Sequence, residues 1–220
     1  MAPDAATRHC RLYLITPPRF EAAAFAGELA AALDAGDVAC VQLRLPRADD
    51  DDIRAAARAL MAVCHARDVA FLLENRVDLA AELGADGVHL ADSGAVAMAR
   101  SRLGAGTIVG ASCGGSRHAA MDAAEAGADY VSFGAVFPSP TIPQAAVVGV
   151  ETIAWWSGLM EIPGVAVGGI TPENCASPVA AGADFLAVCA AVWSAAKGPS
   201  AAVAAFISAI DRAVESPGSS

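Results

Sequence analysis

Charged residues are scarce in this chain, at 17% of its 220 residues, whereas hydrophobic residues make up 55%. This composition supplies ample apolar area for a large core and excludes a largely disordered chain. No apolar stretch reaches the roughly 18 to 20 uninterrupted residues that a membrane-spanning helix needs. The opening residues, MAPDAATRHC, also lack the apolar segment of a signal peptide. We therefore expect a cytoplasmic protein without a membrane partner.

Several chemical signatures are missing as well. The six cysteines include no C-x-x-C pair and several lie in apolar runs, which indicates reduced thiols and argues against disulfides or a zinc site. The four histidines have no metal-binding spacing, and the sequence offers no Ser-His-Asp or Cys-His set. A net charge of −10 without a Lys/Arg stripe excludes nucleic acid as a partner. An anionic ligand must therefore be held locally, by groups such as backbone N–H at helix starts.

The chain does contain a regular alternation of two kinds of segment. Short runs rich in Val, Ile and Leu alternate with longer Ala-rich segments that have the composition of helices. The short runs are apolar throughout, as expected for parallel strands that are covered on both faces. This alternation predicts an α/β fold, either a closed barrel or an open doubly wound sheet. The predicted strands are residues 11–16, 38–44, 69–73, 87–90, 107–111, 130–133, 165–168 and 185–189.

An internal repeat favours the barrel. The tripeptide Gly-Ala-Asp occurs at residues 84–86, 127–129 and 182–184, with a looser copy at Gly36-Asp37. Each glycine follows an Ala-rich segment and is placed to end that helix in the left-handed conformation. The spacing corresponds to two strand–helix units, so four copies account for eight strands. We predict a single-domain (β/α)8 TIM barrel over residues 10–212, with a frayed N-terminus at 1–9 and a flexible tail at 213–220.

The sequence VAVGGITPEN, residues 165–174, is the clearest binding signal. The seventh strand runs into Gly168 and Gly169, and position 171 or 172 is expected to open a helix. Barrels hold phosphate at the helix start that follows the seventh strand. Cys189 and Ala190 follow the eighth strand and form a matching turn. The alternative is that both are ordinary turns whose small residues serve packing alone.

Polar residues at other strand ends point to the same face of the barrel. Gln42 and Arg44 alternate at the end of the second strand, so both are expected to face inward. A buried Arg needs an anion, which is either a ligand or a structural salt-bridge partner. Ser112 ends the fifth strand, while Ser139 and Thr141 offer hydroxyl groups in the irregular stretch 134–149. A loop of that length inside a compact domain is usually functional.

Three other features have mainly structural interpretations. The acidic run at residues 49–52 starts a helix, where it suits the helix dipole. His89, on an apolar strand, is more often a hydrogen-bonded core residue than a titrating one. The Trp155-Trp156 pair either packs against a partner or fills the gap between helix and barrel, so homo-oligomer formation stays open.

Several segments together resemble a known family. From LYLIT through VQLR, NRVDLA, LGADGVHL, AGADYVSFGAVFPSPT, VAVGGITPEN and AGADFLAV, the chain is similar to thiamine phosphate synthase and its relative, the thiazole tautomerase. The similarity runs in order over about residues 11–195. It implies a transferase of thiamine biosynthesis that joins a pyrimidine methyl pyrophosphate to a thiazole phosphate. Pyrophosphate leaves with the help of Mg²⁺, a pyrimidine cation forms, and the thiazole nitrogen attacks it.

The resemblance assigns substrate-binding roles on matching positions, with small phosphorylated molecules as partners: thiazole phosphate, the pyrimidine pyrophosphate, or thiamine phosphate. The residues are Gly168, Gly169, Cys189 and Ala190 for the thiazole phosphate group, Ser139 and Thr141 for the thiazole, and Gln42, Arg44 and Ser112 for the pyrimidine pyrophosphate.

The chain also departs from the family pattern in one half of that site. Lysines of the family are replaced by Pro46 and Ile142, and metal-binding aspartates by Asn75 and Gly94. A pyrophosphate with about three negative charges loses neutralising partners in this way. The nearest carboxylates, those of Glu74 and Asp92, are the candidates for a rebuilt Mg²⁺ site.

Three functional interpretations follow. The first, which we favour, is a divergent enzyme of thiamine biosynthesis with synthase-like chemistry. The second is a non-catalytic or tautomerase-like protein that binds thiazole phosphate or thiamine phosphate. For the tautomerase, the catalytic His corresponds to Gly114, with His118 four residues further along. The third is another phosphate barrel, such as a sugar phosphate epimerase, which predicts an acid–base pair or metal ligands that the strand ends do not offer.

Overall fold

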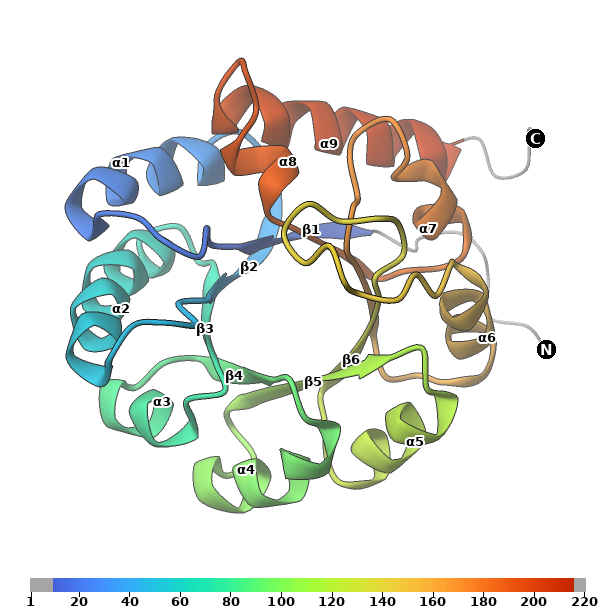
Figure 1. Cartoon of the computed structure of the whole chain (residues 1–220), viewed down its shortest axis with the longest axis horizontal. Coiled ribbons are helices and arrows are strands. Elements are labelled where there is room, and N and C mark those ends of the chain that lie inside the picture. Colours follow the sequence, from blue (N-terminus) through green and yellow to red (C-terminus); the bar gives the residue numbers. More distant parts are fainter. Residues whose placement is uncertain (1–9, 216–220) are drawn as a thin grey trace.

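The computed structural model describes residues 10–215, which form a closed barrel of eight parallel strands surrounded by helices (Figure 1). The strands are β1 Arg11–Ile15, β2 Val38–Leu43, β3 Ala70–Glu74, β4 Gly87–Leu90, β5 Ile108–Gly114, β6 Tyr130–Phe133, β7 Gly164–Val167 and β8 Phe185–Val188. The helices are α1 Ala22–Leu33, α2 Asp50–His65, α3 Val77–Leu83, α4 Val96–Leu103, α5 Arg117–Glu125, α6 Glu151–Leu159, α7 Ala176–Ala180, α8 Ala190–Trp193 and α9 Pro199–Glu215, with a 3₁₀ turn η1 at Ser93–Ala95.

The predicted TIM barrel is confirmed, and strand order follows chain order around the ring. The predicted strand ends differ from the observed ones by at most a few residues, with the largest difference at the end of β5. The predicted N-terminal segment 1–9 lies outside the described residues. The C-terminal boundary needs a correction, because α9 continues to Glu215 and residues 213–215 are helical. Ala213 packs against the hydrophobic core, and this contact keeps the last turn of the helix in place.

Apolar side chains form two separate cores. The interior of the barrel contains a small cluster, while a much larger cluster fills the layer between the strands and the helices. This division follows from the alternation of side chains along each strand, which sends successive residues to opposite faces. On β1, for example, Tyr13 points inward, whereas Leu12 and Leu14 are fully buried under the helices.

The repeated Gly-Ala-Asp tripeptides tie the strands together at the amino end of the barrel. Each glycine of the three copies has positive φ and ends a helical segment, as predicted. Each aspartate carboxylate then accepts the N–H of a residue in the preceding odd-numbered strand, at 2.7 to 2.8 Å. The aspartate N–H donates back to the carbonyl of the same residue at 2.8 to 3.0 Å. We call these three pairs the rim clasps; they join Asp86 to Phe71, Asp129 to Val109, and Asp184 to Gly164.

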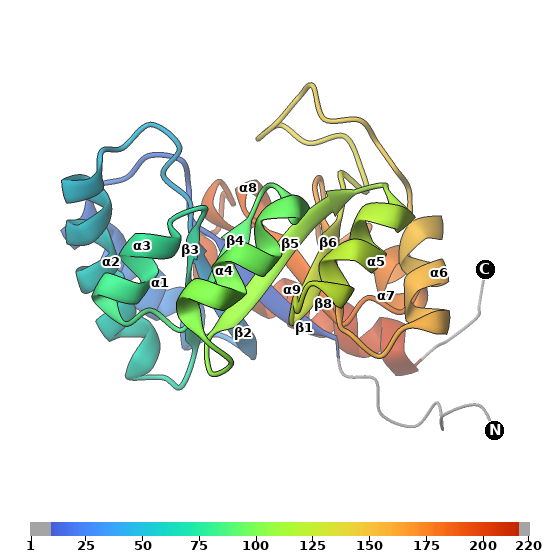
Figure 2. The same cartoon turned by 90° about the horizontal axis from the view of Figure 1, so that it is seen from below.

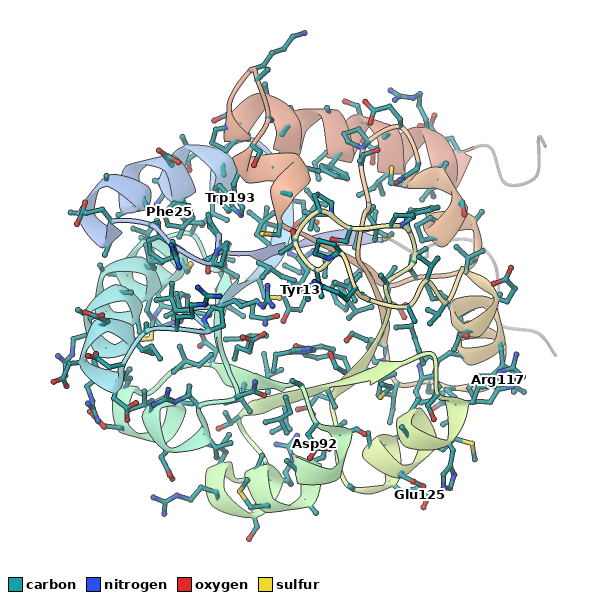
Figure 3. All side chains as sticks on the ribbon, viewed as in Figure 1. Tyr13, Phe25, Asp92, Arg117, Glu125 and Trp193 are labelled. Atoms are coloured by element: carbon teal, nitrogen blue, oxygen red, sulfur yellow. The ribbon has the colours of Figure 1, made fainter. Side chains whose placement is uncertain are left out.

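The first and last strands meet at a seam that also involves two helices. β1 pairs with β8 in parallel register. The Trp193 indole N–H donates to the carbonyl of Ile15 at 2.7 Å. The Trp193 ring also packs edge-on against Phe25 of α1, with ring centres 4.7 Å apart (Figure 3). α8 is therefore fixed directly above the end of β1.

Two features with structural interpretations behave as expected. Asp49 caps α2, since its carboxylate accepts the N–H of Asp52 at 2.9 Å. Trp156 is 1% exposed and its indole N–H donates to the carbonyl of Ile162, so it fills the space between α6 and the barrel. Trp155 packs beneath the Arg117 guanidinium, 4.7 Å from the ring centre. Homo-oligomer formation stays a prediction.

The long loop between β6 and α6, residues 134–149, crosses the mouth of the barrel and rises above the ring of strands (Figures 1 and 2). Its base is fixed by backbone hydrogen bonds, in which Val136 and Phe137 donate to the carbonyls of Val167 and Gly168 at 2.9 and 3.0 Å. The returning part of the loop is held where Val148 donates to Ala135 at 2.8 Å. The loop is thus attached to the turn that follows β7.

Candidate functional site

A cavity of about 590 Å³ opens at the carboxyl ends of the strands and is bordered by the 134–149 loop. All of the substrate-binding residues predicted from the sequence line this one cavity. They are Gln42, Arg44, Ser112, Ser139, Thr141, Gly168, Gly169, Cys189 and Ala190. Their assembly in one place supports the prediction, while their individual roles stay predictions. Among residues 10–215, Arg44 is the only Lys or Arg that lines the cavity.

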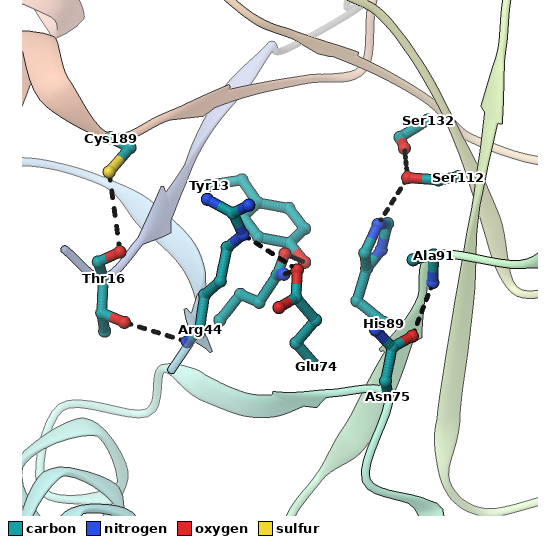
Figure 4. A network of polar contacts seen from close by, with 11 residues as sticks. Tyr13, Thr16, Arg44, Glu74, Asn75, His89, Ala91, Ser112, Ser132 and Cys189 are labelled. Atoms are coloured by element: carbon teal, nitrogen blue, oxygen red, sulfur yellow. Dashed lines mark hydrogen bonds and ion pairs between the residues drawn. The ribbon is translucent and has the colours of Figure 1, made fainter. Parts of the chain in front are cut away.

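Arg44 is held in place by Glu74. The Arg44 Nε donates to Glu74 Oε1 at 3.1 Å, and the Gln42 amide nitrogen donates to the same oxygen at 3.3 Å (Figure 4). Desolvation raises the pKa of the Glu74 carboxyl, against the opposing charge and hydrogen bond of Arg44. Within residues 10–215, no group accepts a hydrogen bond from the two terminal nitrogens of Arg44. Arg44 therefore has both a structural partner and free N–H groups for an anion.

A chain of polar contacts crosses the inner end of the cavity. Tyr13 OH donates to Gln42 Oε1 at 2.8 Å and lies 2.9 Å from the Tyr130 hydroxyl. The Tyr130 oxygen lies 2.8 Å from His89 Nδ1, and His89 Nε2 lies 3.1 Å from the Ser112 hydroxyl. Burial lowers the pKa of His89 to about 4, so the ring is neutral at physiological pH. His89 is the hydrogen-bonded core residue that the sequence indicated.

The turns after β7 and β8 present backbone N–H groups to the cavity. Among the described residues, none accepts a hydrogen bond from the N–H groups of Gly169, Ile170 or Ala190. These residues all line the cavity. Unpaired N–H groups that converge on one point attract an oxyanion such as phosphate.

The helix predicted to open at Thr171 or Pro172 begins later, and this expectation is corrected. Residues 171–175 form a turn, and α7 starts at Ala176. The Asn174 side chain accepts the Thr171 N–H at 2.8 Å and donates to the Gly169 carbonyl at 2.9 Å. Because these bonds satisfy the backbone of the turn, the helix is delayed by about one turn.

Gly168 and Gly169 are required by the close approach of the 134–149 loop as well as by the turn. Both have positive φ, at 98° and 66°. A Cβ on Gly169 would lie 2.7 Å from the Phe137 carbonyl oxygen and still closer to that of Pro138. A Cβ on Gly168 would lie 2.7 Å from Ala135. The packing interpretation of these glycines is therefore correct in part, and it is compatible with anion binding by the N–H groups.

The loop and the β8 turn complete the outer wall. Thr141 N–H donates to the Ser139 hydroxyl at 3.3 Å. The Cys189 thiol donates to the Thr16 carbonyl at 3.5 Å, and desolvation raises its pKa, which makes it a poor nucleophile. Ile142, at the position of a family lysine, is 45% exposed and contributes no charge.

The described residues do not fit the magnesium site that the family resemblance implies. Asn75 Oδ1 accepts the Ala91 N–H at 2.7 Å, and Gly94 has no side chain. Glu74 is bound to Arg44, while the Asp92 carboxylate accepts the Gly94 N–H at 2.9 Å and caps η1. Between residues 10 and 215, no three His, Cys, Asp or Glu side chains gather in a way that could hold a metal ion. Glu74 and Asp92 thus serve local contacts in place of a shared ligand set.

The residues discussed for a tautomerase lie elsewhere. Gly114 ends β5, and His118 is on α5, where its side chain is 87% exposed and lies 3.4 Å from Asp122. Neither residue lines the cavity.

Sequence reasoning missed part of the inner wall. Tyr13, Tyr130 and Ser132 were not singled out, although each is a polar or aromatic residue at an inward position of an otherwise apolar strand. The alternation that located Gln42 and Arg44 would have found them.

No helix in the described part of the chain is long and apolar enough to cross a membrane.

The fold and the cavity define an α/β barrel with a small-molecule site at the carboxyl ends of its strands. The profile of the thiamine monophosphate synthase family matches residues 12–192. The chain belongs to this family.

Individual relatives support the same assignment. A thiamine-phosphate synthase of Rhodospirillum centenum is 56% identical over 198 residues, which cover 90% of this chain and 96% of the relative. A thiamine-phosphate synthase of Erythrobacter litoralis is 47% identical over 189 residues, which cover 84% of this chain and 88% of the relative. Among solved structures, the thiamine phosphate pyrophosphorylase from Pyrococcus furiosus superposes with a TM-score of 0.81 at 29% identity, covering 92% of this chain and 96% of the other.

Proposed function

We propose that this protein is a thiamine phosphate synthase, a transferase that joins a pyrimidine methyl pyrophosphate to a thiazole phosphate. The bond between the pyrimidine methylene carbon and pyrophosphate breaks, and a bond from that carbon to the thiazole nitrogen forms. Pyrophosphate departs with the bonding electron pair. The observation that carries the proposal is the single cavity that joins the Arg44 guanidinium to the free N–H groups after β7 and β8.

The two anionic groups would occupy opposite walls of the cavity. The thiazole phosphate would accept hydrogen bonds from the N–H groups of Gly169, Ile170 and Ala190, near Ser139 and Thr141. The pyrophosphate would lie at the free terminal nitrogens of Arg44, and the pyrimidine ring against Gln42 and Ser112. The 134–149 loop would cover the site and exclude water from the cation that forms.

Magnesium is a cofactor of this reaction in the family, but residues 10–215 of this chain do not form a protein site for it. We therefore assign no step to the metal, and we assign the neutralisation of the departing pyrophosphate to Arg44. The cytoplasmic location also stays a prediction.

A second candidate is binding of thiazole phosphate or thiamine phosphate without coupling. It is favoured by one observation: the described part of the chain places a single Lys or Arg in the cavity lining, and Glu74 already pairs with it. Tautomerase chemistry is less well supported, because His118 lies on the outside of α5.

Product formation separates the two candidates. The full chain is incubated with the pyrimidine methyl pyrophosphate and thiazole phosphate, in parallel with Mg²⁺ and with EDTA, and thiamine phosphate is measured by chromatography. We expect product well above the uncatalysed control in the Mg²⁺ samples. Saturable binding of thiazole phosphate without any product would instead support the binding protein.

The phosphate position is tested by a matched pair of variants. Gly169→Asp is expected to abolish thiazole phosphate binding, but its Cβ also collides with the loop. Ala190→Asp avoids that collision because position 190 already carries a Cβ. Calorimetry should show at least a tenfold weaker affinity for Ala190→Asp than for Ala190→Asn, since the two differ mainly in charge and like charges repel. Equal affinities would place the phosphate elsewhere.

A further inference from the structure

The chain of polar contacts that crosses the barrel has a direction, in the sense that the chemistry of its side chains determines which atom donates each hydrogen bond. Its members come from six different strands, and consecutive polar atoms lie 2.8 to 3.3 Å apart. Every link has to contain one hydrogen, because two facing lone pairs repel and two facing hydrogens collide. The members, in spatial order, are Glu74, Gln42, Tyr13, Tyr130, His89, Ser112 and Ser132. Figure 4 shows the link from His89 through Ser112 to Ser132.

The direction starts at Glu74. Its Oε1 accepts from Arg44 Nε, and a carboxylate paired with a guanidinium has no hydrogen to donate. Gln42 must therefore turn its amide nitrogen toward Glu74, which leaves the amide oxygen facing Tyr13. A tyrosine hydroxyl has one hydrogen, and that of Tyr13 is consequently donated to Gln42.

The remaining links follow in turn. Because the hydrogen of Tyr13 is used, the 2.9 Å contact between the two hydroxyls must contain the hydrogen of Tyr130. The Tyr130 oxygen then accepts from His89, which requires a hydrogen on Nδ1. A neutral imidazole carries only one N–H, so Nε2 is bare and accepts from Ser112. Ser112 in turn accepts from Ser132 at 3.3 Å.

We propose that Glu74 is a positioning residue that orients this whole chain, holds His89 in the Nδ1–H tautomer, and makes the inner wall of the cavity rich in hydrogen-bond acceptors. A carboxylate at this end of the chain can only accept, so it fixes the donor of the first link and of every link after it. Its second oxygen has no hydrogen bond to any residue between 10 and 215, and Ser112 keeps a lone pair toward the cavity.

Nitrogen-15 NMR of the histidine rings tests the direction of the chain. In the full-length protein labelled at histidine, long-range ¹H–¹⁵N correlation spectra separate protonated from bare ring nitrogens, and His89→Gln identifies the His89 signals. We expect the proton on Nδ1 in the unsubstituted protein. A proton on Nε2 would overturn the proposal.

Two variants reverse the direction from a distance. Gln42→Leu removes the acceptor for Tyr13, so the hydrogens of Tyr13 and Tyr130 turn toward His89 and the imidazole proton moves to Nε2. Tyr13→Phe has the same expected result, and it serves if Gln42→Leu does not fold. The matched control is Ser132→Ala at the opposite end, which should leave the proton on Nδ1. An unchanged tautomer in folded Gln42→Leu or Tyr13→Phe, or a switch in Ser132→Ala, would show that Glu74 does not set the direction.

Discussion

Carboxylates bind different kinds of partner at the two ends of this barrel. At the amino end, the rim clasps of Asp86, Asp129 and Asp184 bind backbone N–H groups of the neighbouring strands. At the carboxyl end, Glu74 lines the cavity and uses one oxygen to hold the side chains of Arg44 and Gln42.

The difference shows which contacts serve stability and which serve a ligand. Backbone partners cannot move without unfolding the strand, so the carboxylates of the rim clasps are fixed parts of the fold. The partners of Glu74 are side chains with further donors and acceptors that remain free. The contacts at the amino end of the barrel therefore stabilise the fold, whereas those at the carboxyl end serve ligand binding.

The largest effect should come from removing the cation of the carboxyl end. Arg44→Gln deletes the only guanidinium that the described residues place in the cavity lining. Thiamine phosphate formation should therefore fall by about 100-fold to 1,000-fold in kcat/KM, in the range for loss of one electrostatic stabiliser. Steady-state kinetics with chromatographic detection of thiamine phosphate measures this fall in kcat/KM. The control is Arg11→Gln at the amino end, whose exposed pair with Asp37 should contribute about 1 kcal/mol of stability at most and nothing to turnover. Equal losses of kcat/KM in Arg44→Gln and Arg11→Gln would contradict the proposed difference between the two ends of the barrel.

The next effect concerns pH. The pKa of His89 is lowered by burial to about 4, below the value of 6.5 for an exposed histidine, so the unfolded chain takes up the proton first on acidification. The stabilising contribution is thus complete above about pH 6.5 and is lost as the pH falls toward 4, by roughly 3 kcal/mol in total. Urea unfolding across this range should show a steeper loss of stability in the unsubstituted protein than in His89→Gln. Parallel pH curves for the two proteins would contradict a buried neutral imidazole.

The smallest of the three effects tests the amino end. Asp184→Ala breaks one rim clasp, and loss of a charge-assisted hydrogen bond to a backbone N–H should lower the free energy of unfolding by about 2 kcal/mol. The kcat/KM of the folded protein should not change, since Asp184 is at the far end from the cavity. Asp211→Ala, an exposed carboxylate on α9, is the control and should stay within about 0.5 kcal/mol. A fall in kcat/KM for folded Asp184→Ala would indicate that the two ends are coupled.

Much of this arrangement could be predicted from the sequence, because it depends on local patterns. Apolar runs located the strands, and the spacing of Gly-Ala-Asp indicated a barrel of paired units. The alternation of side chains along β2 correctly predicted that Gln42 and Arg44 face inward.

What could not be predicted depends on contacts between distant segments. The late start of α7 results from the Asn174 side chain, which satisfies the turn ahead of it. The link between Tyr13 and Tyr130 joins residues 117 positions apart, and no local pattern encodes which inward side chains will meet. The partnership of Glu74 with Arg44 likewise appears only once β2 and β3 lie side by side.

The rim clasps also bear on the order in which this chain acquires its structure. Each connects residues only 15 or 20 positions apart, whereas the contact of Trp193 with Ile15 spans 178 positions. Short loops close at lower entropic cost and faster than long ones. During synthesis the clasps can therefore close one after another as each even-numbered strand emerges. The seam between β1 and β8, in contrast, joins the first strand to the last and has to wait for nearly the whole polypeptide.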